Sequence, residues 1–112
     1  MPVIEANGQS VAQSNLTSAS GASSYTDWFV PERRTDFNIF LSGTGVGTVV
    51  LELSPDKGVT VFGIYAAGEQ LYTWNYTGTN LSEVANEPES DMYYRLRCTS
   101  YTSGTITARL SK

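Results

Sequence analysis

The acidic loop is the part of this sequence whose residue types come nearest to a catalytic or metal-binding site. Glu87, Glu89 and Asp91 stand at alternate positions around Pro88. A pair of carboxylates is enough for glycoside hydrolysis, and carboxylate oxygens also bind Ca²⁺. The ligand order of an EF-hand is missing, however, and acids on a proline-containing loop are usually solvated. We therefore expect neither catalysis nor metal binding here.

The remaining chemistry is limited by the absence of histidine and by a single cysteine, Cys98. Without histidine there is no Ser-His-Asp or Cys-His arrangement, and one thiol cannot build a zinc site. Cys98 occupies an inward position of a predicted strand, where a thiol behaves as a small apolar side chain rather than a nucleophile. Gly43-Thr-Gly-Val-Gly47 lacks the lysine and the following helix of a phosphate-binding loop. The sequence predicts no enzyme activity, no catalytic residue, no cofactor and no metal.

Arginine and tyrosine predict an interaction surface instead, because both are enriched at protein interfaces. By alternation, the last two predicted strands direct Tyr93, Arg95, Arg97 and Arg109 outward, and Arg33 and Arg34 stand together between the first two predicted strands. The candidate contacts in this group are Arg33, Arg34, Tyr93, Arg95, Arg97 and Arg109. A second interpretation stays open: the arginines pair across strands with Glu52, Glu83 or Asp36, and surface ion pairs of this kind contribute little.

The elements that must position these residues are short strands with alternating apolar and polar side chains. Predicted strands cover residues 25–30, 35–42, 47–54, 59–66, 70–77, 81–85, 93–102 and 105–110. A Ser103-Gly104 turn joins the last two, which we expect to pair as an antiparallel hairpin. With many Tyr, Thr and Val and no helical period, residues 25–112 predict an all-β domain. We expect an antiparallel β-sandwich, jelly-roll or Ig-like, of about eight strands.

Residues 1–24 differ from this domain, because they are polar, carry one charge and show no sustained period. One interpretation is a tail without contacts. The other is an extended N-terminal arm that orders against a partner, with Val3, Ile4, Val11 and Leu16 as its apolar contacts. A segment of this composition cannot offset its ordering entropy alone. We favour the arm because these apolar residues stand near its tip and at spacings that suit an extended chain in a groove, and because its near absence of charge differs from tails that only solubilise.

The overall charge restricts the class of partner. The chain has 112 residues, a net charge of −4 and a pI near 4.6, which argue against nucleic acid and anionic membranes as partners. No apolar run reaches the roughly 20 residues of a membrane-spanning helix. Trp74, with Tyr72 and Tyr76 on the same side of one strand, belongs to the core or a subunit contact, or else forms a platform for a sugar ring.

Five stretches together resemble a known group of proteins. They are Phe37-Asn-Ile39, Ser42-Gly-Thr44, Gly47-Thr-Val-Val-Leu-Glu52, Ser54-Pro-Asp-Lys-Gly58 and Tyr94-Arg-Leu-Arg-Cys-Thr-Ser-Tyr-Thr-Ser-Gly-Thr105. The pattern resembles small structural β-sandwich proteins of tailed bacteriophages, of the capsid decoration or cement type. Residues 59–86 depart from it, since in that group a Trp closely follows the turn.

The resemblance implies a virion structural protein that docks on the shell of the major capsid protein and stabilises it, with the N-terminal arm reaching neighbouring subunits. It implies a homo-oligomer, a dimer or trimer, made in the host cytoplasm and located on the capsid surface. The alternative is a carbohydrate-binding module, or a structural β-sandwich of the tail or tail fibre.

Overall fold

The structure is a computed structural model that describes residues 11–31, 36–86 and 92–112. Its elements, in chain order, are β1 (Val11–Leu16), the short 3₁₀ helix η1 (Gly21–Ser24), β2 (Asp36–Ser42), β3 (Val46–Ser54), β4 (Phe62–Gly63), β5 (Tyr65–Ala66), β6 (Glu69–Gln70), β7 (Thr73–Tyr76), β8 (Leu81–Asn86), β9 (Tyr93–Ser103) and β10 (Ile106–Ser111). Within these ranges no helix is long and apolar enough to cross a membrane.

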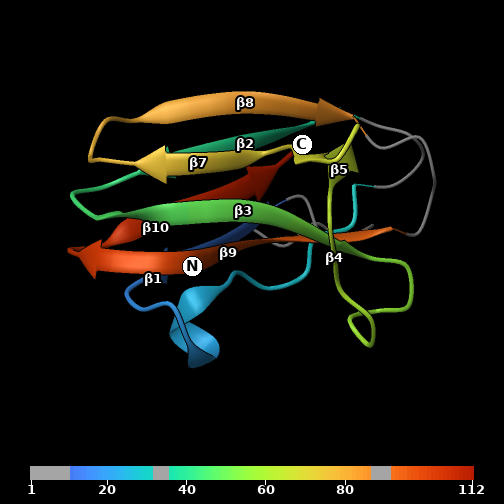
Figure 1. Cartoon of the computed structure of the whole chain (residues 1–112), viewed down its shortest axis with the longest axis horizontal. Coiled ribbons are helices and arrows are strands. Elements are labelled where there is room, and N and C mark those ends of the chain that lie inside the picture. The colour runs from blue at the N-terminus through green and yellow to red at the C-terminus, as the bar shows by residue number, and fades with distance from the viewer. Residues whose placement is uncertain (1–10, 32–35, 87–91) are drawn as a thin grey trace.

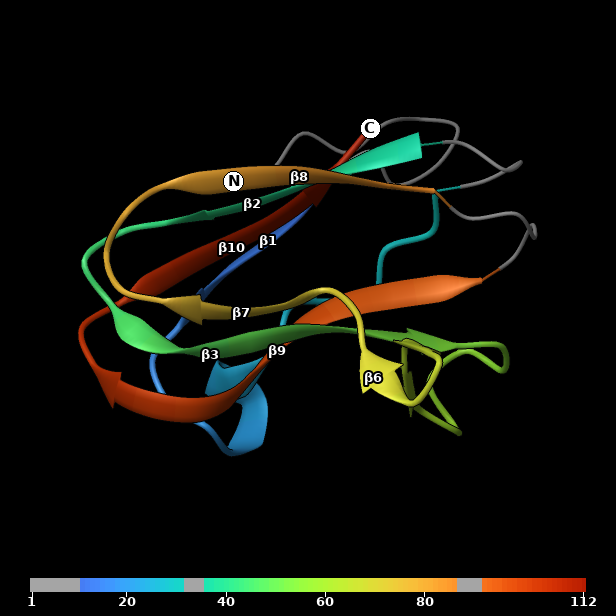
Figure 2. The ribbon, with the colours of Figure 1, turned by 45° about the horizontal axis from the view of Figure 1, so that its top comes forward.

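Apart from the short β5–β6 hairpin, the strands form two antiparallel sheets packed face to face (Figures 1 and 2). The first sheet has the order β1-β10-β2-β8, and the second is built on β3, which pairs with β9 on one side and with β4 and β7 on the other. Residues 25–30 run along the free side of β9. The N–H of Phe29 donates to the carbonyl of Tyr94 at 2.7 Å, and the N–H of Tyr94 donates back at 2.8 Å.

The topology is that of a jelly roll once β4 and β7 are treated as two parts of one edge strand. β4 pairs with the Leu53 end of β3, the Leu51 N–H donates to the Tyr72 carbonyl, and β7 continues the pairing from Val50. If residues 25–30 count as a strand, eight segments in chain order give sheets 1-8-3-6 and 2-7-4-5. This confirms the all-β sandwich of about eight strands and selects the jelly roll over the Ig-like arrangement.

The predicted hairpin of the last two strands is wrong. β9 pairs with β3 in one sheet, whereas β10 pairs with β1 and β2 in the other. At Gly104, which has a φ of +73°, the chain turns from one sheet to the other. Gly104 lies so close to Gly45 that a Cβ added to Gly104 would lie 2.8 Å from the Gly45 Cα. Alternation identifies the apolar side of each strand. It cannot identify the neighbour, because both sheets bury the same core.

A β-bulge in β9 also changes the predicted direction of one tyrosine. Thr48 pairs with Ser100 and Val49 with Cys98, so Thr99 is an extra residue on β9. A bulge resets the alternation of side chains beyond it. Tyr101, which strict alternation from Tyr93 would place on the outer face, therefore packs against the core, and its hydroxyl donates to the Gly104 carbonyl at 2.6 Å.

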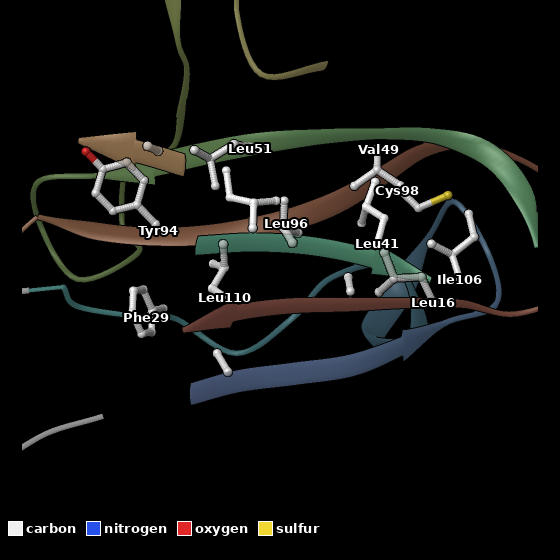
Figure 3. Packing of buried hydrophobic residues seen from close by; sticks show 14 of the residues in the cluster. Leu16, Phe29, Leu41, Val49, Leu51, Tyr94, Leu96, Cys98, Ile106 and Leu110 are labelled. Carbon is white, nitrogen blue, oxygen red and sulfur yellow. The ribbon is translucent and has the colours of Figure 1, made fainter. Parts of the chain in front are cut away.

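The core lies between the two sheets (Figure 3). Its fully buried side chains include Leu16, Phe29, Phe37, Ile39, Leu41, Val49, Leu51, Leu96, Cys98, Ile106, Ala108 and Leu110. The Phe37 ring lies between Phe29 and Tyr94, with centroids 5.6 and 4.8 Å away. Aromatic packing of this kind links residues 25–30 to both sheets.

The first sheet begins inside the segment that the sequence assigns to an arm. Residues 11–16 form β1, in which Leu16 is fully buried and Val11 is half-buried. Leu16 is therefore a core residue of its own chain, whereas the sequence assigns it to an arm contact. A mostly polar sequence forms this strand because β10 supplies its backbone partners and only Ala12 and Leu16 need an apolar environment. Val3 and Ile4 lie outside the described residues.

Candidate interaction surfaces

Arg95 on β9 lies in a compact cluster on the outer face of the second sheet. Its Nε donates to Glu52 Oε1 at 2.9 Å, and Arg97 Nη1 donates to Glu52 Oε2 at the same distance. The Arg95 guanidinium lies 4.4 Å from the centroid of the Tyr25 ring and 4.6 Å from that of Trp28. The sequence supplies this geometry because Glu52 and Arg95 stand directly opposite on β3 and β9.

The cluster is mainly internal structure. The Arg95 side chain is 17% exposed and that of Glu52 is 9% exposed, against 42% for Arg97. Trp28 closes the cluster against Gly58, where an added Cβ would lie 2.8 Å from the indole nitrogen. The cross-strand pairing with Glu52 is thus the observed arrangement, and Arg97 keeps the larger surface for an external partner.

The other predicted contacts do not join this cluster. Arg109 lies on the outer face of the first sheet, where its Nη1 donates to Gln13 Oε1 at 2.9 Å. Tyr93 is half-buried at the start of β9, opposite Ser54. Arg33 and Arg34 lie outside the described residues. Because β9 and β10 belong to different sheets, the predicted arginine surface is divided between opposite faces of the sandwich.

Trp74 is half-buried and packs against the core at the open edge between β7 and β8. Its Nε1 donates to Glu83 Oε1 at 2.9 Å, and its ring lies 6.4 Å from that of Tyr72 at 47°. Tyr76 is fully buried and donates its hydroxyl to the Gly43 carbonyl at 2.8 Å. These three rings therefore do not form a flat exposed platform for a sugar.

Among the described residues, the largest group of exposed apolar side chains lies where the sequence predicts ordinary strands. We call it the apolar tip, and it consists of Val59, Val61, Phe62, Tyr65 and Leu71, which are 84, 36, 49, 62 and 41% exposed. All five belong to residues 59–71, which carry a single charged residue, Glu69. Figure 2 shows the β5–β6 part of this region at one end of the second sheet.

The tip exists because the edge strand next to β3 is interrupted. Between β4 and β7 the chain leaves the sheet at Ile64 and returns at Leu71, whose N–H donates to the Ile64 carbonyl at 2.7 Å. Ala67 and Gly68, both at positive φ (54° and 85°), form the two-residue turn of the β5–β6 hairpin. In the sequence the Gly68 turn signal is visible, but nothing in it says that both flanking strands leave the sheet.

The described part of the chain offers no cluster of reactive groups. It holds no group of three or more His, Cys, Asp or Glu side chains that could bind a metal. Cys98 is buried, and its Sγ–H donates to the Ser100 carbonyl at 3.3 Å. Burial raises the pKa of this thiol, which keeps it protonated at neutral pH. Glu87, Glu89 and Asp91 of the acidic loop are not among the described residues.

Comparison with protein-family models gave no match, and comparison with curated proteins gave none either.

Proposed function

We propose that this protein is a non-enzymatic structural protein of a phage virion, of the capsid decoration or cement type, which docks on the shell of the major capsid protein. The observation that carries the proposal is the apolar tip. Single exposed apolar residues are ordinary, but a group of them on one short segment is characteristic of an interaction site. The sequence resemblance supplies the class of partner, and the jelly roll is a fold that also occurs in viral capsid proteins.

The two sheets of the sandwich are consistent with a structural role. Among the described residues, every buried side-chain nitrogen and oxygen has a hydrogen-bond partner. The tip, by contrast, leaves apolar side chains exposed to solvent. A shell presents many identical sites, so copies linked to one another can occupy several of them at once. If copies are linked, avidity increases the overall affinity further.

The experiment is a binding assay on empty shells assembled from the major capsid protein encoded with this chain. Shells are incubated with the protein and pelleted, and bound protein is quantified. The double variant Phe62→Ser with Tyr65→Ser removes apolar area from the tip without touching the core. We expect occupancy at limiting protein concentration to fall about tenfold, since roughly 1.4 kcal/mol of lost binding energy corresponds to that factor.

The matched control is Val84→Ser, which removes a 57% exposed apolar side chain from β8, away from the tip. This variant should bind like wild type. Failure of the wild-type protein to bind shells, or equal binding by the tip variant, contradicts the proposal. Binding to purified tails instead of shells would favour the tail alternative, and glycan binding that Trp74→Ala abolishes would favour the carbohydrate-binding one.

A further inference from the structure

The four edges of the two sheets are not equally protected against pairing with another strand. An exposed edge strand presents unpaired N–H and C=O groups, and proteins usually block it with charges, bulges or irregular segments. β8 has Glu83 on its inward side, opposite the buried Ile39 and bonded to Trp74. The edge formed by β4 and β7 is interrupted by the 64–71 excursion. Residues 25–30 contain Asp27 and pair with β9 only at isolated bridges.

β1 has none of these devices. Its sequence, Val-Ala-Gln-Ser-Asn-Leu, holds no charge, proline or glycine, and it pairs with β10 over all six residues without a bulge. In an antiparallel pair, every second residue directs its N–H and C=O away from the neighbour. β1 is the terminal strand of the first sheet, and within the described ranges β10 is its only strand neighbour.

We infer that β1 is a self-association edge, at which a second copy of this chain pairs antiparallel with β1 and joins two four-stranded sheets into one. A twofold axis through Ser14 places Gln13 opposite Asn15 of the second copy, on the same outer face. It also places Ala12 opposite Leu16 of the second copy, on the inner face. This inference does not depend on docking to a shell.

Self-complementarity is what favours a second copy over another partner. A twofold interface uses the same patch twice, so its groups must complement themselves. The amides of Gln13 and Asn15 both donate and accept hydrogen bonds, and each already accepts one from its β10 neighbour, Arg109 or Thr107. The chain has a net charge of −4, so copies repel one another elsewhere, whereas β1 against β1 brings no charges together.

The experiment is sedimentation velocity on the full chain over about a hundredfold range of concentration. The wild-type protein should shift toward twice its 12.2 kDa mass as concentration rises. The double variant Gln13→Glu with Asn15→Glu should raise the dissociation constant about tenfold or more, because the introduced carboxylates stand opposite one another. Its fold is protected, since Arg109 and Thr107 can still donate to the new carboxylates.

The control is Ser82→Glu with Val84→Glu, which adds the same charge to the outer face of β8, and it should associate like wild type. A second measurement uses Ser14→Cys, which should form an intermolecular disulfide under mild oxidation faster than Ser82→Cys does. A wild-type protein that stays monomeric throughout overturns the inference. Association of the β1 variant equal to wild type, or equal crosslinking by the two cysteine variants, also overturns it.

Discussion

Replacement of Arg95 by alanine is expected to destabilise the fold far more than replacement of any other described arginine. Although Arg95 alternates outward on β9, its guanidinium is enclosed between the rings of Tyr25 and Trp28 and bonded to Glu52. The substitution removes all three interactions and leaves Glu52, itself 7% exposed as a whole residue, with Arg97 as its cation.

The magnitude follows from these contacts. A hydrogen bond between charged groups contributes about 1.5–3 kcal/mol, and a partly desolvated cation–π contact about 0.5–2 kcal/mol. Because Arg97 continues to neutralise Glu52, the full cost of an unpaired buried charge is avoided. We expect Arg95→Ala to lower the free energy of unfolding by about 3 kcal/mol. For a domain of this size that corresponds to a fall in Tm of roughly 12 °C.

Urea denaturation followed by tryptophan fluorescence measures this change, and Trp28 reports directly on the cluster. Arg109→Ala is the matched control, since Arg109 is half-buried on the opposite face and donates to the neutral amide of Gln13. Its loss should cost about 0.5 kcal/mol, and Arg97→Ala should fall between the two. An Arg95→Ala variant no less stable than Arg109→Ala would refute the reasoning that this arginine holds residues 25–30 against the sheet.

Two further predictions concern titratable groups. The N–H of Thr60 and the hydroxyl of Ser54 donate to Asp56 and lower the pKa of its carboxyl below the ordinary 3.8. The stabilisation from the Asp56 carboxylate is therefore complete above pH 3.8 and is lost as the pH falls through the lowered pKa. The stability difference between wild type and Asp56→Asn should shrink in urea titrations below about pH 4, and a constant difference would contradict this. Burial raises the pKa of the Cys98 thiol and shields it from solvent. At about pH 8, a thiol reagent should therefore label the folded protein only as fast as the fold opens, and should label the urea-unfolded protein at once. Equal labelling rates would show that the thiol is accessible in the folded protein.

The sequence predicts the fold class because alternation depends on burial, and burial is local to each strand. Phe37, Ile39 and Leu41 on β2 lie inside as their spacing indicates, and so do Leu96 and Cys98 on β9. The same spacing does not indicate which strands are neighbours. The assignment of β9 and β10 to different sheets depends on the close approach of Gly104 and Gly45, which are far apart in the sequence.

The interaction surfaces are harder to predict, because they depend on what the fold leaves uncovered. Arg95 has the residue type of an interface contact, but Tyr25 and Trp28, brought beside β9 by long-range pairing, cover it. Phe62 and Tyr65 have the residue type of a core, but the excursion between β4 and β7 leaves them exposed. The residue type is predicted correctly in both cases, but its exposure depends on the fold: a distant segment covers Arg95, and a local excursion from the sheet exposes Phe62 and Tyr65.

The two proposed surfaces are compatible in one assembly, because they belong to different sheets. The apolar tip is built by residues 59–71 at the end of the second sheet, and the β1 edge is built by residues 11–16 of the first. A pair of chains joined through β1 would therefore present two free tips. Where both tips of such a pair reach the shell at once, the second tip binds at an effective concentration set by the geometry of the pair rather than by the concentration in solution. The Gln13→Glu with Asn15→Glu variant should then also bind shells more weakly than wild type, while the tip variant should lose shell binding and still dimerise.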